Sequence, residues 1–284
     1  MKIEIIKCLQ DNYAYLVIDK TNSLAIVIDP SESKPIIDYI EKNKLNLKFI
    51  LNTHHHFDHV GGNKELKKKY NSKVIGFEKD KNRIPEIDIA LGDKEIWRSN
   101  NFETKIYHVP GHTSGHICYH FFKQNILFTG DTLFSLGCGR IFEGTYEEMF
   151  SSLQLIKSFP EETKIYCGHE YTLKNSEFCI KYDKNNSILR EKIRSVKTKL
   201  EKGLPTIPST IKEELDNFHT YSLTIPGRGS PNLEIYFEDK LSNIDFVLFI
   251  EQTKKNRLII ENLNLQVIYE NNSGIIASNA KGID

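Results

Sequence analysis

Short apolar runs recur along the chain as far as Cys167, and amphipathic stretches separate them. Ile, Val, Phe and Tyr are concentrated in these runs, as is typical of β-strands. The runs that we interpret as strands cover residues 15–29, 48–52, 73–77, 105–109, 117–122, 125–128 and 164–167. This alternation of strand-like and helix-like segments predicts an α/β or α+β fold.

Helices are predicted between these strands, over residues 32–43 and 62–70, and a third begins at Thr145. Glu148 follows Thr145 by three residues, which is the spacing of a capping box. After Cys167 the pattern indicates a helical pair, 171–182 and 187–202, which Pro205 ends. Residues 226–231 are rich in Gly and Pro and are expected to form a linker. Beyond the linker, residues 233–237, 246–250, 258–260 and 265–269 are strand-like.

The charge balance argues against a nucleic-acid partner. The 284 residues include 38 Lys+Arg and 38 Asp+Glu, so the formal net charge is zero, whereas nucleic-acid binding needs a basic excess or a basic stripe. Five scattered cysteines without CxxC spacing indicate a reducing compartment. The N-terminus does not resemble a signal peptide, and the longest apolar run, 246–250, is too short to cross a membrane. We expect a cytoplasmic protein without a membrane partner, monomeric or weakly dimeric.

The sequence Thr-His-His-His-Phe-Asp-His at residues 53–59 carries the strongest chemical signal. His54 and His56 follow an apolar run and are two residues apart. If the chain is still extended there, both imidazoles point the same way and can share one metal ion. Asp58 and His59 can address a second metal ion from the same loop. Burying this many polar side chains without partners would cost too much free energy for a purely structural role.

The same arrangement recurs three times downstream. His112, Asp131 and His169 each follow a predicted strand, and each is preceded by a glycine that allows a sharp turn and a close approach to a ligand. Strands that end at one edge of a sheet would bring these loops together, which is where open α/β sheets place their sites.

The candidate ligands number five histidines and two aspartates. One catalytic zinc ion needs only three protein ligands, so this set predicts two metal ions, with Asp131 as the bridge because a carboxylate has two oxygens. Such a pair can lower the pKa of a shared water to about 7. His and carboxylate ligands suit zinc, iron or manganese.

The other histidines are interpreted differently. His55 lies between two candidate ligands and is predicted to be structural. His116 is predicted to hydrogen-bond within its loop or to support the metal ligands. His108, His120 and His219 are interpreted as ordinary core or surface residues.

These motifs resemble those of the metallo-β-lactamase superfamily and, within it, the glyoxalase II (hydroxyacylglutathione hydrolase) family. The resemblance covers roughly residues 1–215. It rests on residues 11–13, 53–63, 112–119, 128–134, 137–140, 142–145, 166–172, 189–192 and 205–210. It implies a four-layer αββα sandwich followed by a smaller helical region. The corresponding division is a catalytic domain at 1–172, a helical region at 173–216 and an atypical tail at 217–284.

The resemblance also implies a reaction, the hydrolysis of S-D-lactoylglutathione and related 2-hydroxyacylglutathiones to D-lactate and glutathione by a metal-bridging hydroxide. This is the second step of methylglyoxal detoxification. The implied cofactors are two divalent metal ions, with zinc preferred over iron and manganese. The implied metal ligands are His54, His56 and His112 on one ion, Asp58, His59 and His169 on the other, and Asp131 on both. Asp58 and Asp131 are the implied catalytic residues.

For substrate binding, the resemblance implies Arg140, Phe142 and Tyr171. Arg140 stands where the family has a lysine, and its guanidinium can still bind a carboxylate. Phe142 stands where a tyrosine is usual, so it keeps the ring and loses a hydroxyl. The family's basic C-terminal helix has no counterpart that can be aligned after Asn217, which predicts weaker use of glutathione thioesters.

Three alternatives stay open at this point. Another enzyme of the superfamily would share the motif, such as another thioesterase or a persulfide dioxygenase with a single iron, and the dioxygenase would not need all seven ligands. A nucleic-acid processing enzyme also shares the motif, and a salt-dependent RNA-binding assay would detect it. A catalytically silent scaffold would purify without metal.

Overall fold

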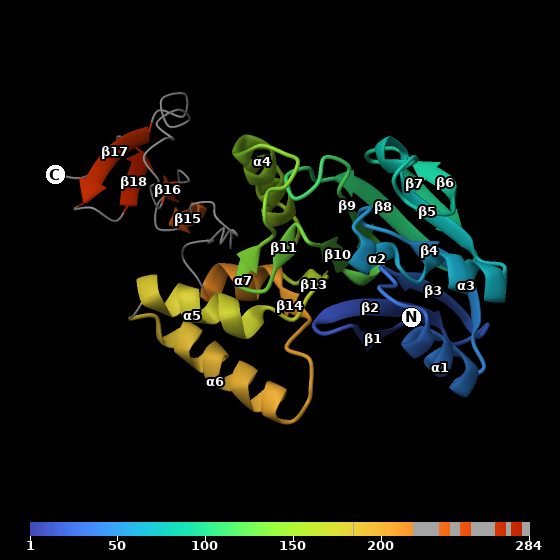
Figure 1. The fold of residues 1–284 in the computed structure, drawn as a ribbon. Helices are drawn as coiled ribbons and strands as arrows, with labels where there is room; N and C mark the ends of the chain where they lie inside the picture. The colour runs from blue at the N-terminus through green and yellow to red at the C-terminus, as the bar shows by residue number, and fades with distance from the viewer. Residues whose placement is uncertain (184, 218–232, 239–244, 251–264, 271–273, 280–284) are drawn as a thin grey trace.

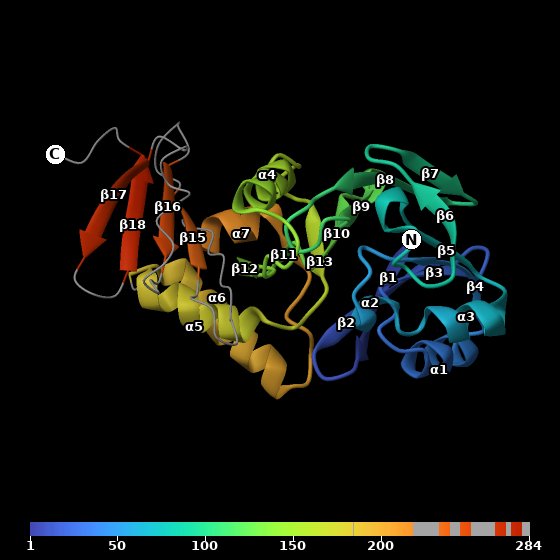
Figure 2. The same ribbon diagram turned by 45° about the horizontal axis from the view of Figure 1, so that its top comes forward.

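The computed structural model describes residues 1–183, 185–217, 233–238, 245–250, 265–270 and 274–279. Two six-stranded sheets lie at its centre (Figure 1, Figure 2). The first has the order β1-β2-β3-β4-β5-β6, with β1 (Lys2–Cys8), β2 (Asn12–Asp19), β3 (Leu24–Ile28), β4 (Asn46–Leu51), β5 (Lys73–Phe77) and β6 (Ile87–Leu91). The second has the order β14-β13-β10-β9-β8-β7, with β7 (Ile96–Ser99), β8 (Phe102–His108), β9 (Ile117–Phe121), β10 (Ile126–Gly130), β13 (Lys164–Cys167) and β14 (Ser209–Thr210).

Seven α-helices are found in the described residues. They are α1 (Lys34–Lys42), α2 (Phe57–Val60), α3 (Asn63–Tyr70), α4 (Tyr146–Lys157), α5 (Thr172–Tyr182), α6 (Ser187–Glu201) and α7 (Ile211–Asn217). The smaller elements are the 3-10 helices η1 (Glu78–Asp80) and η2 (Phe122–Gln124) and the paired strands β11 (Leu133–Phe134) and β12 (Gly137–Cys138). None of the described helices is long and apolar enough to cross a membrane.

The two sheets pack face to face, and helices cover both outer faces. Side chains of both sheets form the core between them, among them Tyr15 and Phe77 of the first and Tyr119 and Phe128 of the second. Helices α1 and α3 pack on the outer face of the first sheet, and α4, through Met149, packs with α7 on the outer face of the second. Inner strands buried on both faces read as continuous apolar runs. The predicted four-layer αββα sandwich is confirmed.

The prediction of one strand over residues 15–29 is wrong. These residues belong to the antiparallel hairpin β2–β3. Its turn is polar, and the Asp19 carboxylate accepts hydrogen bonds from the Thr21 N–H at 3.0 Å and the Asn22 amide at 2.7 Å, as turn residues commonly do. The apolar pattern also misses β1, β6 and β7. These are three of the four edge strands of the two sheets, where charged side chains are common.

The predicted helices are present, with ends shifted by one or two residues. At α4, the Thr145 hydroxyl accepts from the Glu148 N–H at 3.2 Å and the Thr145 N–H donates to the Glu148 carboxylate at 2.8 Å. This reciprocal pair satisfies two backbone N–H donors at the start of the helix, and it confirms the predicted capping box.

Glu170 connects the helical region to the sandwich. Its carboxylate accepts hydrogen bonds from the Tyr13 hydroxyl at 2.5 Å, from the Thr206 N–H at 2.8 Å and from the Thr206 hydroxyl at 2.7 Å. Tyr13 lies on β2, whereas Thr206 follows α6. Because Glu170 is adjacent to His169, the same contacts hold the loop that carries this candidate ligand.

The described residues after Asn217 form a separate sheet of four antiparallel strands. They are β15 (Leu233–Glu238), β16 (Asp245–Ile250), β17 (Leu265–Glu270) and β18 (Gly274–Asn279), in the order β15-β16-β18-β17. Three of the predicted strand-like runs lie in β15, β16 and β17, and β18 was not predicted. The run 258–260 and His219 lie outside the described residues.

Candidate metal centre

The topology of the second sheet brings three candidate ligands to one edge. Strands β8 and β10 both pair antiparallel with β9, so they run in the same direction, and β13 pairs parallel with β10. The loops that follow β8, β10 and β13 therefore emerge at the same edge. They carry His112, Asp131 and His169, as the sequence predicts.

The remaining candidates come from the first sheet. Strand β4 ends at Leu51, so His54 and His56 lie in the loop that follows it and not in the strand. Asp58 and His59 lie on the one-turn helix α2. The loop is nevertheless well anchored, because the Asp29 carboxylate accepts from the Thr53 N–H at 2.8 Å and from its hydroxyl at 2.7 Å.

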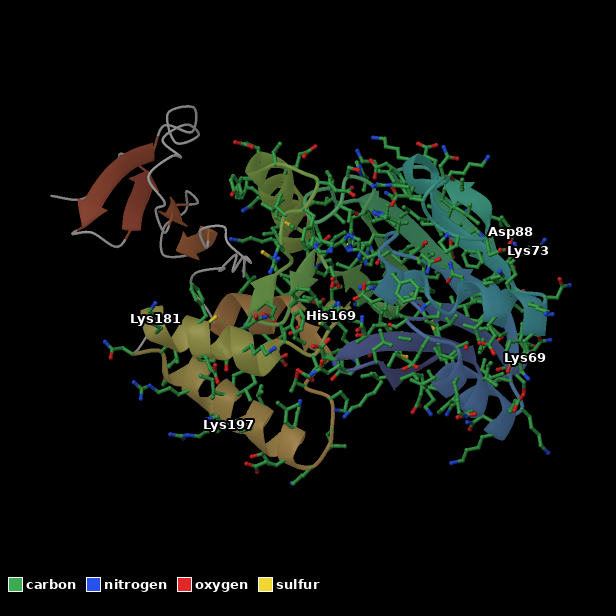
Figure 3. All side chains as sticks on the ribbon, viewed as in Figure 1. Lys69, Lys73, Asp88, His169, Lys181 and Lys197 are labelled. Atoms are coloured by element: carbon green, nitrogen blue, oxygen red, sulfur yellow. The ribbon has the colours of Figure 1, made fainter. Side chains whose placement is uncertain are left out.

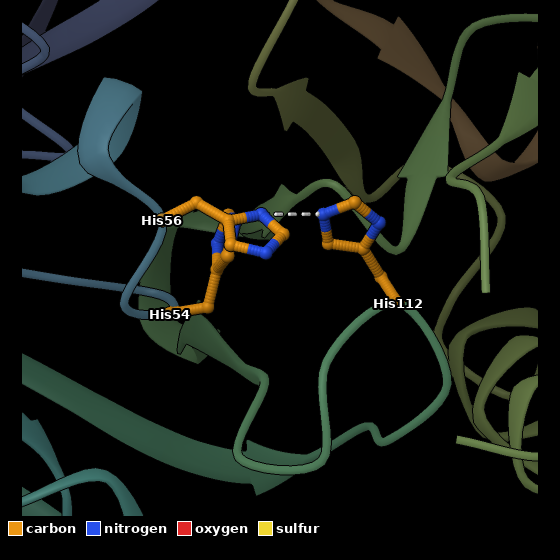
Figure 4. Close-up of side chains that lie close together, drawn as sticks. All are labelled: His54, His56 and His112. Atoms are coloured by element: carbon orange, nitrogen blue, oxygen red, sulfur yellow. Dashed lines mark hydrogen bonds between the residues drawn. The ribbon is translucent and has the colours of Figure 1, made fainter. Parts of the chain in front are cut away.

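Three imidazoles form the first ligand group, His54, His56 and His112 (Figure 4). The distance from His56 Nδ1 to His54 Nε2 is 3.1 Å, and that to His112 Nε2 is also 3.1 Å. A tetrahedral zinc ion with Zn–N bonds of about 2.0–2.1 Å separates its ligand nitrogens by about 3.3–3.4 Å. Two of the three nitrogen pairs are thus spaced as ligands of one ion would be, within a few tenths of an ångström, and the third lies within 4.8 Å.

The second ligand group contains Asp58, His59 and His169. Asp58 Oδ2 lies 3.4 Å from His169 Nε2 and 3.7 Å from His59 Nε2. Figure 3 shows His169 near the middle of the molecule, where the helical pair α5–α6 approaches the sheets. This group differs from the first in containing a carboxylate, which also suits a divalent cation.

Asp131 lies between the two groups. Its Oδ2 is 3.5 Å from His112 Nε2 of the first group and 3.2 Å from His169 Nε2 of the second, and its Oδ1 is 3.4 Å from His59 Nε2. A single carboxylate therefore faces ligands of both groups. This is the position expected of a bridging ligand.

Two buried polar atoms at this point have no hydrogen-bond partner, His59 Nε2 and Asp131 Oδ1. An unsatisfied buried polar atom usually costs about 1–3 kcal/mol, so such atoms are rare and call for an explanation. They lie 3.4 Å from each other beside the second ligand group. A divalent cation held by that group would satisfy both atoms, and together with the three imidazoles of the first group the residues present therefore fit a two-metal centre.

In each of the four buried candidate histidine ligands, the Nδ1 atom is held by a neighbour. His59 Nδ1 lies 3.1 Å from Asp29 Oδ2, His112 Nδ1 2.7 Å from the Arg140 carbonyl, and His169 Nδ1 3.0 Å from Asp11 Oδ1. His54 Nδ1 lies 3.0 Å from the Thr53 hydroxyl. Such contacts fix the tautomer so that Nε2 faces the metal site.

Asp29 is a supporting residue that sequence reasoning missed, although an acidic residue directly after strand β3 could have indicated it. It also forms a third possible cluster with His54 and His59. Its oxygens, however, already accept hydrogen bonds from Thr53 and face His59 Nδ1. Asp29 therefore orients ligands rather than binding an ion itself.

The two groups differ electrostatically. Burial lowers the pKa of His54 and His112, and it lowers the pKa of His56 to about 4. Burial also opposes the charge of His59 and His169, but the Asp131 carboxylate outweighs it, raising the pKa of His59 and bringing that of His169 to about 9. The first group therefore consists of neutral imidazoles at pH 7, whereas the second group holds protons that an incoming cation must displace.

His116 hydrogen-bonds to this centre, whereas His55 does not. His116 Nε2 accepts from the Asp131 N–H at 3.1 Å, and its ring stacks on His54 with centroids 4.6 Å apart. His116 therefore lies against two candidate ligands, as expected for a residue that supports the metal ligands. His55 points away from the ligands and contacts Asp80 and Glu143. His108 stacks on Phe77.

A cavity of about 620 Å³ opens over the ligands. Arg140, Phe142 and Tyr171, the predicted substrate-binding residues, line it together with Lys174, which sequence reasoning missed. The Phe142 ring lies 5.2 Å from His112, and the Tyr171 ring stacks on His169 at 4.7 Å. Arg140 and Lys174 lie over these rings at 5.3 Å and 5.8 Å. Each ligand group thus has its own wall of one aromatic ring and one cation.

Comparison with known proteins agrees with this geometry. The model of the metallo-beta-lactamase superfamily matches residues 10–93 and 99–169, and that of the hydroxyacylglutathione hydrolase C-terminus matches residues 170–217. Among solved structures, the BLEG-1 B3 metallo-beta-lactamase superposes with a TM-score of 0.55 at 24% identity, covering 59% of this chain and 91% of that one. TTHA1623 in a di-iron-bound form superposes with a TM-score of 0.50 at 26% identity, covering 60% of this chain and 92% of that one.

Curated relatives are more similar in sequence. Hydroxyacylglutathione hydrolase of Pelagibacter ubique is 64% identical over 216 residues, covering 76% of this chain and 90% of that protein. The cytoplasmic hydroxyacylglutathione hydrolase of Arabidopsis thaliana is 42% identical over 222 residues, covering 76% of this chain and 86% of that protein. Both family models end at or before Asn217. On the strength of the fold, the ligand set and these relatives, the chain belongs to the hydroxyacylglutathione hydrolase family of the metallo-beta-lactamase superfamily.

Proposed function

We propose that this protein hydrolyses S-D-lactoylglutathione, and related 2-hydroxyacylglutathiones, to a 2-hydroxy acid and glutathione, the second step of methylglyoxal detoxification. The observation that carries the proposal is the position of Asp131, which faces both ligand groups at the floor of a cavity. Relatives up to 64% identical are hydroxyacylglutathione hydrolases, which supports the thioester as the substrate class.

His54, His56 and His112 would hold one cation, Asp58, His59 and His169 the other, and Asp131 both. We propose zinc, with iron or manganese as alternatives that metal analysis would identify. Bound divalent cations supply a water-derived nucleophile at neutral pH and Lewis-acid stabilisation of a carbonyl oxygen.

The chain's own groups prepare this chemistry. Asn12 donates to Asp58 Oδ2 at 3.0 Å, and the nearby histidines together with Asn12 lower the pKa of Asp58 against the effect of burial. Asp58 therefore stays ionised and oriented at the cavity floor, where it can accept a proton from water. The leaving group is a thiolate, which is weakly basic, so the reaction does not need a strong general acid.

We propose that the cavity walls bind the glutathione moiety. Glutathione carries two carboxylates, and Arg140 and Lys174 are cations that line the cavity. Arg140 can form a two-pronged contact with a carboxylate, whereas Lys174 acts as a point charge. Phe142 and Tyr171 would pack along the peptide between them.

The remaining sequence-based predictions stay proposals. We propose that the chain acts in the cytoplasm, which is the location given in the name of the Arabidopsis relative. It would act as a monomer or weak dimer on a small-molecule thioester, without a nucleic-acid or membrane partner. Residues 1–172 would form the catalytic domain, 173–216 the helical region and 217–284 a divergent tail.

Metal analysis combined with hydrolysis of S-D-lactoylglutathione tests this proposal. The wild type should contain two metal ions per chain, and Asp131→Ala should lose metal and at least about 10³-fold in kcat/KM, since one residue serves both ligand groups. Asp88→Ala, which removes a surface carboxylate beside Lys67, is the control and should behave as the wild type. Equal activity of Asp131→Ala and wild type would refute the mechanism, and one iron per chain without hydrolysis would favour a dioxygenase.

A further inference from the structure

A network of charged and polar side chains lies behind the metal ligands. We call Asp80, Arg83, Ser114 and Glu143 the loop clamp. Arg83 Nη1 donates to both oxygens of Glu143 at 2.8 Å, and Glu143 Oε2 also accepts from the Ser114 N–H and hydroxyl at 2.9 Å each. Arg83 Nε donates to Asp80 Oδ1 at 3.0 Å. These contacts join three segments that are distant in the sequence.

The clamp reaches the metal-binding loop through His55. His55 Nδ1 lies 3.3 Å from Asp80 Oδ2, and His55 Nε2 lies 3.4 Å from Glu143 Oε1. The neighbours of His55 in the chain, His54 and His56, belong to the first ligand group. One network therefore contacts both the loop that presents metal ligands and the loop that contains Glu143.

Glu143 belongs to the segment 139–144, which we call the substrate loop because it carries Arg140 and Phe142. Backbone contacts join it to the His112 loop, with Phe142 N donating to His112 O at 3.1 Å and Gly144 N to Gly111 O at 3.2 Å. The approach is so close that a Cβ on Gly144 would lie 2.6 Å from Gly111 Cα. The two loops are thus packed backbone to backbone.

Apolar burial does little to hold the tip of the substrate loop. Phe142 is 58% exposed, so much of its ring gains nothing from removal from water. The tip is therefore held by polar contacts, namely the two backbone hydrogen bonds to the His112 loop and the side-chain contacts of the adjacent Glu143. Asp80, whose side chain is fully buried, anchors Arg83 at the other end, and such fork-like charged contacts are directional.

We propose that Arg83 and Glu143 are a positioning pair, which holds the substrate loop so that Arg140 and Phe142 face the cavity and thereby sets the affinity for the glutathione thioester. The inference rests on the proposed function. Neither residue touches the reacting atoms or a metal-binding atom. Loss of the pair should therefore weaken substrate binding while leaving the metal centre and the chemical step in place.

A double-mutant cycle with Arg83→Gln and Glu143→Gln tests the pair. Each single variant should raise KM for S-D-lactoylglutathione about fivefold, as expected for a partly exposed ion pair, and should raise the inhibition constant of a non-hydrolysable S-alkylglutathione by the same factor. Both should keep kcat within about twofold and the metal content of the wild type. The double variant should resemble the singles, because the pair is lost only once. Arg83→Lys, which keeps the charge, should recover part of the affinity.

The ion pair of Arg98 with Glu103, joined by Nε and Oε1 at 2.7 Å on strands β7 and β8, is the matched control. Arg98→Gln and Glu103→Gln should leave KM unchanged. The inference is wrong if the control variants raise KM as much, if the KM effects multiply in the double variant, or if kcat falls instead of KM rising. If Arg83→Gln does not fold, Ser114→Ala takes its place in the comparison with Glu143→Gln. Ser114→Ala removes one hydrogen bond to Glu143 and should raise KM about twofold, whereas an unchanged KM would contradict the inference. Failure of the wild type to hydrolyse the thioester would instead refute the proposed function.

Discussion

The two candidate ligand groups each contain three residues but differ in physical character. The first consists of three neutral imidazoles, of which His54 is fully buried. The second has Asp58, whose side chain is 38% exposed, and two imidazoles whose pKa the Asp131 carboxylate raises. Burial thus prepares one site by removing protons, whereas charge prepares the other by attracting a cation.

Competition with protons should produce the largest difference between the groups. In the metal-free protein the pKa of His169 is about 9 and that of His59 is raised, so below pH 9 a metal must displace up to two protons from the second group. The pKa of His56 is about 4, so the first group meets no such competition above about pH 5. Affinity at the second group should therefore fall up to about 100-fold for each unit of pH lost.

Dialysis against a chelator at pH 8, 7 and 6, followed by metal analysis, measures this difference. The expected stoichiometry falls from two ions per chain towards one as the pH falls. The ion that remains should be lost on His56→Ala substitution. Simultaneous loss of both ions at every pH would show that the two groups do not differ in this way.

The supporting carboxylates should show the next largest difference. The Asp29 side chain is 3% exposed and contacts both Thr53 and His59, whereas the Asp11 side chain is 32% exposed and contacts His169. Loss of such a contact typically lowers metal affinity 10- to 100-fold. Asp29→Asn should therefore approach a 100-fold loss, equivalent to about 2.7 kcal/mol, and Asp11→Asn about a tenfold loss.

Metal titration of the two variants gives these affinities directly. The structure predicts that Asp29→Asn also lowers the melting temperature, because the Thr53 loop loses its anchor, while Asp11→Asn leaves it nearly unchanged. A larger affinity loss for Asp11→Asn than for Asp29→Asn would show that burial of the supporting carboxylate does not set the size of the effect.

The smallest effect concerns the cavity wall beside the second group. Lys174 lies over the Tyr171 ring, which stacks on His169. Lys174→Gln should raise KM about threefold, because an exposed lysine gains less than 1 kcal/mol from a carboxylate, and should leave kcat unchanged. Lys197→Gln, on the exposed side of α6 (Figure 3), is the control. Increasing the salt concentration should reduce the difference in KM between Lys174→Gln and the wild type. A difference in KM that does not change with salt would count against a charge contact.

Sequence patterns predicted the fold well where strands are buried on both faces. Strands β5 and β13 have the predicted bounds, and α4 begins at the predicted capping box. The pattern failed at the hairpin of residues 15–29 and at the edge strands, because a polar turn and solvated positions interrupt the apolar signal. It also failed for α2, a helix of one turn that is too short to show periodicity.

The amino-acid sequence by itself indicated the class of chemistry, because seven candidate metal ligands, each next to a strand or in one short motif, have few other uses. Only the tertiary structure decided how they act together. It placed Asp131 against both groups, supplied Asp29 and Asp11 from distant parts of the chain, and joined Glu143 to Arg83 across 60 residues of chain. The physical reason is that ligand types follow from local composition, whereas hydrogen-bond partners, burial and pKa depend on segments that meet only when the sheets pack.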